Sequence, residues 1–186
     1  MTQSYRCNLV PNNARVPVLV VSGTVGVGKS TIVGEIHEIL SRANVPHACV
    51  DADALALSWP RRGDFNQAAM LENLASFWQN ARDAGAQRFV LATVVERRED
   101  LLAIRQAIPG AEIVLVKLTA PEAVRFARLQ QREVGSGRVW HVQRTTILQR
   151  ILDNAALHHF AVVNDERPAQ EVALDILIRT GWSVAR

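Results

Sequence analysis

The sequence predicts a doubly wound α/β fold, in which helices cover both faces of one parallel sheet. Short runs of apolar, mostly β-branched residues alternate five times with longer segments whose apolar residues recur at helical spacing. The 186 residues contain no internal repeat and no linker, and 48% of them are hydrophobic, which excludes a disordered chain. Ligands of such sheets bind beyond the carboxyl ends of the strands, so functional residues are expected there.

Each strand is expected where an apolar run is bounded by turn residues. These runs cover residues 16–22, 47–50, 89–95, 113–118 and 161–164. Helical spacing of apolar residues is expected over 29–44, 64–84, 100–107, 119–134, 147–158 and 168–181. Asp64 and Thr119 have the residue types of N-caps for two of these helices. We expect 1–15 to form an N-terminal arm and 16–186 to form a single domain.

The most specific motif lies between the first strand and the first helix. Residues 23–30 read Gly-Thr-Val-Gly-Val-Gly-Lys-Ser, the pattern of a phosphate-binding loop, with a strand before it and a helix after it. Lys29 is expected to contact the β- and γ-phosphates, and the Ser30 hydroxyl to bind Mg²⁺. Backbone N–H groups of the loop surround the phosphate chain, and they belong to Gly23, Thr24, Val25, Gly26, Val27, Gly28, Lys29, Ser30 and Thr31. The sequence therefore predicts a P-loop NTPase fold with a bound nucleoside triphosphate.

Two acids follow the second strand, on the same expected edge of the sheet as the loop. One of Asp51 and Asp53 can accept the proton of an acceptor hydroxyl or, as we expect of Asp51, hold a Mg²⁺-bound water, while the other binds the substrate. The alternative is that these carboxylates cap the following turn. Their position directly after a strand favours a functional role.

Arginines gather after the fourth strand. Arg125, Arg128 and Arg132 share one helix face, and Arg138 and Arg144 follow the break at residues 135–137. Such a segment, about 128–145, is typical of a small helical lid that closes over ATP, with its arginines neutralising the transferred phosphoryl group. The alternative is a solvated basic face.

The acceptor is expected between the two acids and the helix that begins near residue 64. Trp59, Arg61 and Arg62 lie in the intervening loop, where a ring and an anionic group can be held together. The alternative is a surface loop whose Trp59 packs on the edge of the core. Arg97, after the third strand, is a further candidate for an anion contact. Trp78 and Trp182 are expected to pack against the core.

Three classes of P-loop protein are consistent with the loop alone. The sequence lacks the Asn-Lys-x-Asp of a GTPase, and its third strand lacks the acidic pair that ends a Walker B strand in motor ATPases. A kinase needs the loop, an acid near the acceptor hydroxyl and cations over the transferred phosphoryl group, and the sequence has candidates for all three.

These motifs resemble those of P-loop small-molecule kinases, a group that includes adenylylsulfate, gluconate and nucleoside monophosphate kinases. Residues 23–31 match their opening motif, and Asp-Ala-Asp at 51–53 resembles the Asp-Gly-Asp that follows the second strand of the first two. Residues 128–132 resemble the Arg-x-x-x-Arg of the lid, and 162–165 resemble the loop that borders adenine. Ala52 replaces the usual glycine, and the Asp-Gly-x-Pro-Arg of adenylate kinases is missing. The resemblance implies ATP and Mg²⁺ as cofactors and leaves the acceptor open.

The resulting hypothesis is an ATP-dependent phosphotransferase that acts on a small hydroxyl-bearing acceptor. A non-catalytic or regulatory nucleotide-binding protein, and a kinase of a nucleotide or nucleic-acid end, remain as alternatives. The sequence has no apolar run of about 18 residues, no signal-peptide core near its start, and two cysteines without metal-ligand spacing, Cys7 and Cys49. We therefore expect a cytoplasmic protein without a membrane partner. A net charge of +3 is weak evidence for nucleic acid, so no nucleic-acid partner is expected, and a homodimer stays open.

Overall fold

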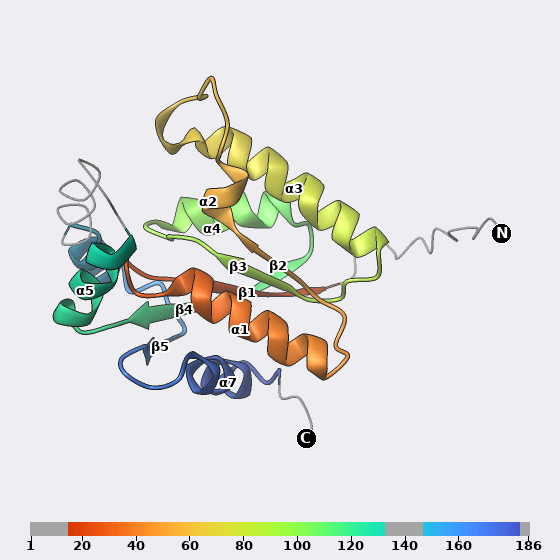
Figure 1. The fold of residues 1–186 in the computed structure, drawn as a ribbon. Coiled ribbons are helices and arrows are strands. Elements are labelled where there is room, and N and C mark those ends of the chain that lie inside the picture. The colour runs from red at the N-terminus through yellow and green to blue at the C-terminus, as the bar shows by residue number, and fades with distance from the viewer. Residues whose placement is uncertain (1–14, 133–146, 183–186) are drawn as a thin grey trace.

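The computed structural model describes residues 15–132 and 147–182, and a five-stranded sheet forms its centre. Neighbouring strands are parallel throughout, in the order β2-β3-β1-β4-β5 (Figure 1). The strands are β1 (Val16–Ser22), β2 (Ala48–Asp51), β3 (Phe89–Ala92), β4 (Ala111–Thr119) and β5 (Phe160–Val163). The predicted five-stranded parallel sheet is confirmed. The expected arm falls almost wholly outside the described residues.

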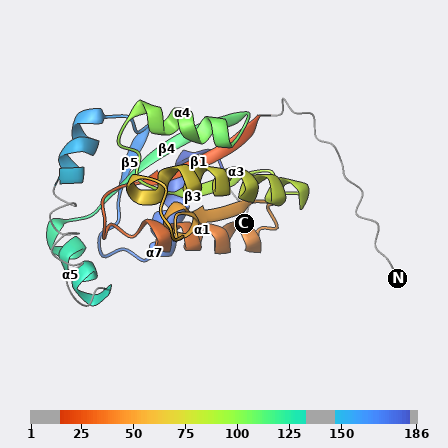
Figure 2. The same cartoon turned by 90° about the horizontal axis from the view of Figure 1, so that it is seen from above.

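Helices cover both faces of the sheet, as Figures 1 and 2 show from two directions. Alternation along β1 explains the two layers, because successive side chains of a strand point to opposite faces. Leu19 and Val21 pack with the apolar sides of α1 (Lys29–Arg42) and α7 (Ala169–Arg179). Val18 and Val20 pack on the other face, with α3 (Gln67–Asp83) and α4 (Arg98–Ala107). Each face thus has its own core cluster.

Shorter elements surround the carboxyl ends of the strands. α2 (Ala52–Leu55) follows β2 directly, and a 3-10 turn η1 (Asp64–Asn66) precedes α3. α5 (Glu122–Arg132) follows β4, and residues 147–155 are helical again beyond a part of the chain that lies outside the described residues. Most of the predicted lid, including Arg138 and Arg144, falls in that part.

β3 is shorter than the predicted strand over 89–95. The chain leaves the sheet after Ala92, although the Thr93 N–H still donates to the Val21 carbonyl at 3.2 Å. Two residues later the Val95 N–H donates to the Ser22 hydroxyl at 3.0 Å. At Val95 a hydrogen bond to a side chain of β1 thus takes the place of a backbone hydrogen bond of the sheet. The apolar run is therefore longer than the strand.

Both predicted N-caps are wrong. Thr119 is the last residue of β4, where its pairing with Val163 keeps it extended, and α5 begins only at Glu122. Asp64 belongs to the 3-10 turn, and Asn66 precedes the first residue of α3. Asn66 has a left-handed φ of 55°, and its amide is buried in the preceding loop.

The other packing predictions are confirmed. Trp78 is 2% exposed and packs edge-on against Phe89, with ring centroids 5.4 Å apart. Trp182 is buried after the end of α7, and the Arg88 guanidinium lies over its ring. Among the helices of the described residues, none combines the length and apolarity that crossing a membrane requires.

Two isoleucines of α7 offer a matched test of this packing. Ile176 is fully buried against α1 and the sheet, whereas Ile178 is 67% exposed. We expect Ile176→Ala to lower the free energy of unfolding by about 2–5 kcal/mol, because it removes buried methyl groups and leaves a cavity. Ile178→Ala should change it by less than about 0.5 kcal/mol. Urea denaturation measures both, and equal effects of the two substitutions would contradict the packing described.

Candidate active site

The phosphate-binding loop connects β1 to α1 at the carboxyl edge of the sheet. Its turn requires glycine at both ends: Gly23 has φ 151° and Gly28 has φ 94°. A Cβ on Gly23 would lie 2.4 Å from the Leu118 carbonyl oxygen, and one on Gly28 would lie 2.5 Å from the Asn164 amide nitrogen. Lys29 folds along the loop, and its Nζ donates to the carbonyls of Gly23 and Thr24 at 3.0 and 3.1 Å.

Side chains from distant parts of the sequence hold the loop in place. The buried Asn164 amide donates to the Val27 carbonyl at 2.7 Å. Arg128 Nη1 donates to the same carbonyl at 3.3 Å and to the Asn164 carbonyl at 3.2 Å, and its Nη2 donates to the Asp165 carbonyl at 3.0 Å. Arg128 therefore joins α5 to the loop and to the end of β5.

Asp51 connects the start of α1 to the end of β2. One carboxylate oxygen, Oδ2, accepts a hydrogen bond from the Ser30 hydroxyl. The other, Oδ1, accepts from the Asp53 N–H at 3.0 Å and caps α2. One alternative for these acids is a functional role beside the phosphate-binding loop, and the other is a helix cap. Asp51 has both contacts, because it caps α2 and also accepts a hydrogen bond from Ser30 at the end of the loop. The Asp53 side chain is exposed, and no described residue forms a hydrogen bond or ion pair with its carboxylate.

The chemistry of this edge fits a triphosphate and Mg²⁺. α1 has 14 residues and no acidic residue of its own in its first turn, where the helix N-terminus carries a partial positive charge and the Asp51 carboxylate contacts Ser30. Mg²⁺ prefers oxygen ligands, and the contact of the Ser30 hydroxyl with the Asp51 carboxylate brings two such groups together. Gly23, Thr24, Val25, Gly26, Val27 and Gly28 can surround phosphate oxygens with backbone N–H groups.

Arg125 is not on a solvated lid surface but inside the structure. It is 9% exposed, and its Nη1 donates to the Thr24 hydroxyl at 3.2 Å and to Gln149 Oε1 at 2.9 Å. Its Nε is buried without a hydrogen-bond partner among the described residues. The guanidinium thus links the loop to both helices that flank the undescribed segment 133–146. The predicted Arg132 ends α5, but its side chain lies outside what the structure describes.

The contact with Gln149 continues into a second polar pair. Gln149 Nε2 donates to both oxygens of Asp153 at 3.1 and 3.0 Å, and the buried Lys117 ammonium on β4 pairs with the same carboxylate. The Lys117 ammonium and the Gln149 amide hold the pKa of Asp153 below its ordinary value. A chain of polar contacts therefore runs from Thr24 to Lys117.

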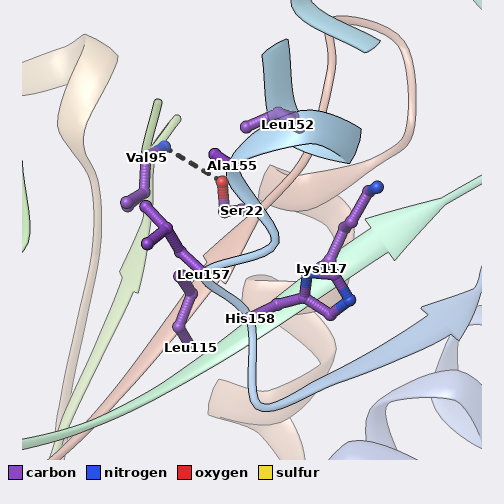
Figure 3. Close-up of a pocket in the computed structure, with 8 residues that line it drawn as sticks. All are labelled: Ser22, Val95, Leu115, Lys117, Leu152, Ala155, Leu157 and His158. Carbon is purple, nitrogen blue, oxygen red and sulfur yellow. Dashed lines mark hydrogen bonds between the residues drawn. The ribbon is translucent and has the colours of Figure 1, made fainter. Parts of the chain in front are cut away.

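A small cavity lies beside Lys117, next to Ser22 at the end of β1. Figure 3 shows Ser22, Lys117 and His158 among its lining residues, together with the hydrogen bond from the Val95 N–H to Ser22. Its volume of about 10 Å³ leaves room for one water molecule at most, so neither a nucleotide nor an acceptor binds there. Burial lowers the pKa of His158, and the Lys117 ammonium lowers it further.

The predicted acceptor loop lies at the surface, and one of its two arginines has a carboxylate partner. Arg62 donates to both carboxylate oxygens of Glu72 on α3, at 3.1 and 2.5 Å, which lowers the pKa of that carboxyl. Arg61 is exposed, and Trp59 is 86% exposed instead of packing on the core edge. Arg97 lies at the start of α4, with its Nη2 3.8 Å from Asp100 Oδ1.

Asn66 holds this loop in shape. Its amide nitrogen donates to the Ala56 carbonyl at 2.8 Å and to the Ser58 hydroxyl at 2.6 Å, and its oxygen accepts from the Arg62 N–H at 2.9 Å. Asn66 is only 2% exposed, so these bonds satisfy a buried amide. The loop keeps Leu57, Trp59 and Phe65 at exposures of 84%, 86% and 65%.

Sequence reasoning missed three features of this region. The sequence places Asn164 only within a loop that resembles one bordering adenine and Arg125 only among the arginines near the lid, and it gives Asn66 no predicted role. Asparagine directly before a helix is a recognisable signal for a cap or a left-handed residue. No local signal identifies the buried partners of Arg125 and Asn164.

No protein-family model matches the chain, and no curated protein sequence matches it significantly. Solved structures do match. The tunicamycin resistance protein of Deinococcus radiodurans is 18% identical with a TM-score of 0.64, over 92% of this chain and 99% of its own. A gluconokinase of Sinorhizobium meliloti 1021 is 22% identical with a TM-score of 0.53, over 89% and 94%. An APS kinase of Mycobacterium tuberculosis, solved with AMPPNP and APS, is 16% identical with a TM-score of 0.57, over 91% and 99%.

The chain has the fold of the P-loop small-molecule kinases. At these identities the likeness establishes the fold and not the reaction. The P-loop kinase fold explains why the loop, Asp51 and Asp53 share one edge, since all the parallel strands end there.

His158 makes the stability of this fold depend on pH. Its pKa in the folded chain lies below the ordinary 6.5, so between these two values the unfolded chain binds more protons. Stability should therefore fall as the pH drops from about 6.5 through the lowered pKa, and this contribution should be constant above about 6.5. Urea denaturation between about pH 7.5 and pH 5 should show a shallower decline for His158→Gln than for the wild type. Identical declines would show that His158 does not carry this dependence.

Proposed function

We propose that the chain is an ATP-dependent phosphotransferase that transfers the γ-phosphoryl group to the hydroxyl of a small molecule. The observation that carries this proposal is the contact between Ser30 and Asp51, with the exposed Asp53 two residues further on. This contact brings the phosphate-binding loop close to Asp53. Ser30 and Asp51 are the pair proposed to bind Mg²⁺, and the Asp53 carboxylate is the group proposed to meet the acceptor.

On the donor side, the loop amides and Lys29 bind the β- and γ-phosphates. Ser30 and Asp51 are the residues that would hold Mg²⁺ through their oxygen atoms. The ion, when bound, neutralises charge on the phosphate oxygens. Arg128 keeps the loop closed against the end of β5, and Arg132 and Arg138 are the proposed cations over the transferred group.

On the acceptor side, Asp53 accepts the hydroxyl proton as the acceptor oxygen forms its bond to phosphorus and ADP departs. Asp51 is less suited to this role, because both of its oxygens already accept hydrogen bonds from Ser30 and the Asp53 N–H. General-base assistance of this kind contributes about 10²–10⁴-fold to a rate.

One observation favours a second candidate, a non-catalytic nucleotide-binding protein. Asp51 caps α2, which gives this acid a structural role that requires no reaction. Such a protein would bind ATP through the same loop and would not need Asp53. The two functions therefore differ in what the Asp53 carboxylate does.

The acceptor loop favours an acceptor with an apolar part. Leu57, Trp59 and Phe65 are exposed on a loop that Asn66 holds in shape, and the loop begins directly after α2. The Glu72 carboxylate already neutralises Arg62, so this arginine offers little to an anionic acceptor. In both views the chain between α2 and α3 lies at the end of the molecule where α1 begins (Figures 1 and 2). We infer a neutral or weakly acidic hydroxyl compound that carries an aromatic ring or an aliphatic chain.

Substitution of Lys29 tests the loop that both candidate functions share, and substitution of Asp53 tests the carboxylate in which they differ. Lys29→Ala should abolish phosphoryl transfer and weaken ATP binding, because it removes the cation at the β- and γ-phosphates. Asp53→Asn should lower kcat by about 10²–10⁴-fold and leave ATP affinity within about twofold. ADP formation is measured with ATP and Mg²⁺ against a panel of hydroxyl compounds, beside the rate without acceptor.

Asp83→Asn at the exposed end of α3 serves as the matched control and should retain full activity. If ATP binds tightly but no compound raises ADP formation above the basal rate, the non-catalytic candidate is supported. Wild-type turnover in Lys29→Ala would refute both.

Trp59→Ala tests the apolar acceptor site. The KM of compounds with an aromatic ring should rise about 10-fold or more, since a contact of this size is worth about 1–3 kcal/mol. The KM of ATP should change less than about twofold, because the loop lies on the acceptor side. Leu102→Ala, another exposed apolar residue, on α4, is the control. Preference for sugar acids, with no effect of Trp59→Ala, is the result that rejects this site.

A further inference from the structure

Three side chains of types that can bind a metal meet at β2, which has β3 as its one partner strand among the described residues. His37 lies on α1, His47 directly precedes β2, and Cys49 lies within β2. One ligand atom from each residue lies within 4.8 Å of the others. His37 Nδ1 is 2.9 Å from His47 Nε2, and the two rings are tilted with centroids 5.1 Å apart. The sequence spacing suggested no metal site at Cys49, because His37 approaches it only through the packing of α1 on β2.

The backbone orients the central ligand of this cluster. His47 Nδ1 lies 2.7 Å from the Val45 carbonyl oxygen, which only accepts hydrogen bonds, so Nδ1 carries the proton. In the neutral imidazole Nε2 is then the nitrogen with a free lone pair, and it faces His37 Nδ1. Metal-binding histidines commonly have such a carbonyl partner on the other ring nitrogen, which fixes the tautomer and the ring orientation.

The types of ligand indicate which ion fits. Two imidazole nitrogens and a thiolate suit Zn²⁺, whereas Mg²⁺ and Ca²⁺ prefer carboxylate and carbonyl oxygens. His37 is exposed and the other two residues are half-buried, so the site is open to solvent on one side. Three protein ligands leave the fourth tetrahedral position for water. Without a metal, burial raises the pKa of the Cys49 thiol to about 12, so the thiol stays protonated and unreactive.

We propose that His37, His47 and Cys49 form a Zn²⁺ site that joins α1 to the edge strand β2. His37 lies eight residues beyond Lys29 on α1, about 12 Å along the helix. The site is therefore separate from the phosphate-binding loop and from its Mg²⁺. An ion held by both α1 and β2 would stabilise the folded chain, including the helix that begins with the loop.

The test uses the full chain without nucleotide or Mg²⁺. A chelator first removes any bound metal, and the chelator is then removed. Titration with Zn²⁺ should show one tight equivalent and raise Tm by about 5–10 °C at a 100-fold excess over Kd. Co²⁺ in its place should give a thiolate-to-metal charge-transfer band. X-ray absorption of the zinc form should show one sulfur and two nitrogen ligands from the protein.

Cys49→Ala and His37→Asn should each weaken binding by more than about 100-fold, since loss of an outer partner alone costs 10–100-fold. His37 is exposed, so its substitution keeps the test valid even if Cys49→Ala fails to fold. Cys7→Ser and His158→Asn are the matched controls and should bind Zn²⁺ like the wild type. The proposal is overturned if the wild type binds no Zn²⁺, if His37→Asn binds it fully, or if a control variant loses it.

Discussion

The hydrogen bond between Ser30 and Asp51 joins the two halves of the candidate active site. Ser30 belongs to the first turn of α1, and Asp51 ends β2, so the contact spans the carboxyl edge of the sheet. The same carboxylate begins α2, which carries Asp53 and leads into the acceptor loop. A single side chain therefore links the elements proposed to bind the acceptor to the phosphate-binding loop.

The arginines of α5 show that a basic helix face can be directed inward. Arg125 and Arg128 contact Thr24, Val27 and the end of β5, and each brings a cation to the loop without pointing to solvent. A buried guanidinium is costly unless its donors are used, so these contacts tie α5 and residues 147–155 to the loop. These hydrogen bonds hold the phosphate-binding loop against α5 and the end of β5.

α1 contributes residues to both proposed sites, the one for the triphosphate and the one for Zn²⁺. Its N-terminal turn faces the site proposed for the triphosphate, and His37 in its second half faces β2 beside His47 and Cys49. Without an ion, the edge strand β2 is held by its pairing with β3 and by apolar contacts of Ala48, Cys49 and Val50 with the two core clusters. An ion at this edge and a nucleotide at the loop would therefore stabilise the same helix from different ends.

The sequence by itself determined the parallel sheet, the phosphate-binding loop and the edge on which Asp51 and Asp53 lie. These are backbone properties, and local patterns of apolar residues and glycines encode them. Only the tertiary structure decided that Thr119 stays in β4, that Glu72 pairs with Arg62, and that Arg125 is buried against Thr24, 101 residues away. The tertiary structure alone also brings His37, His47 and Cys49 together. Side-chain partners depend on which elements pack together, and no local pattern in the sequence carries that information.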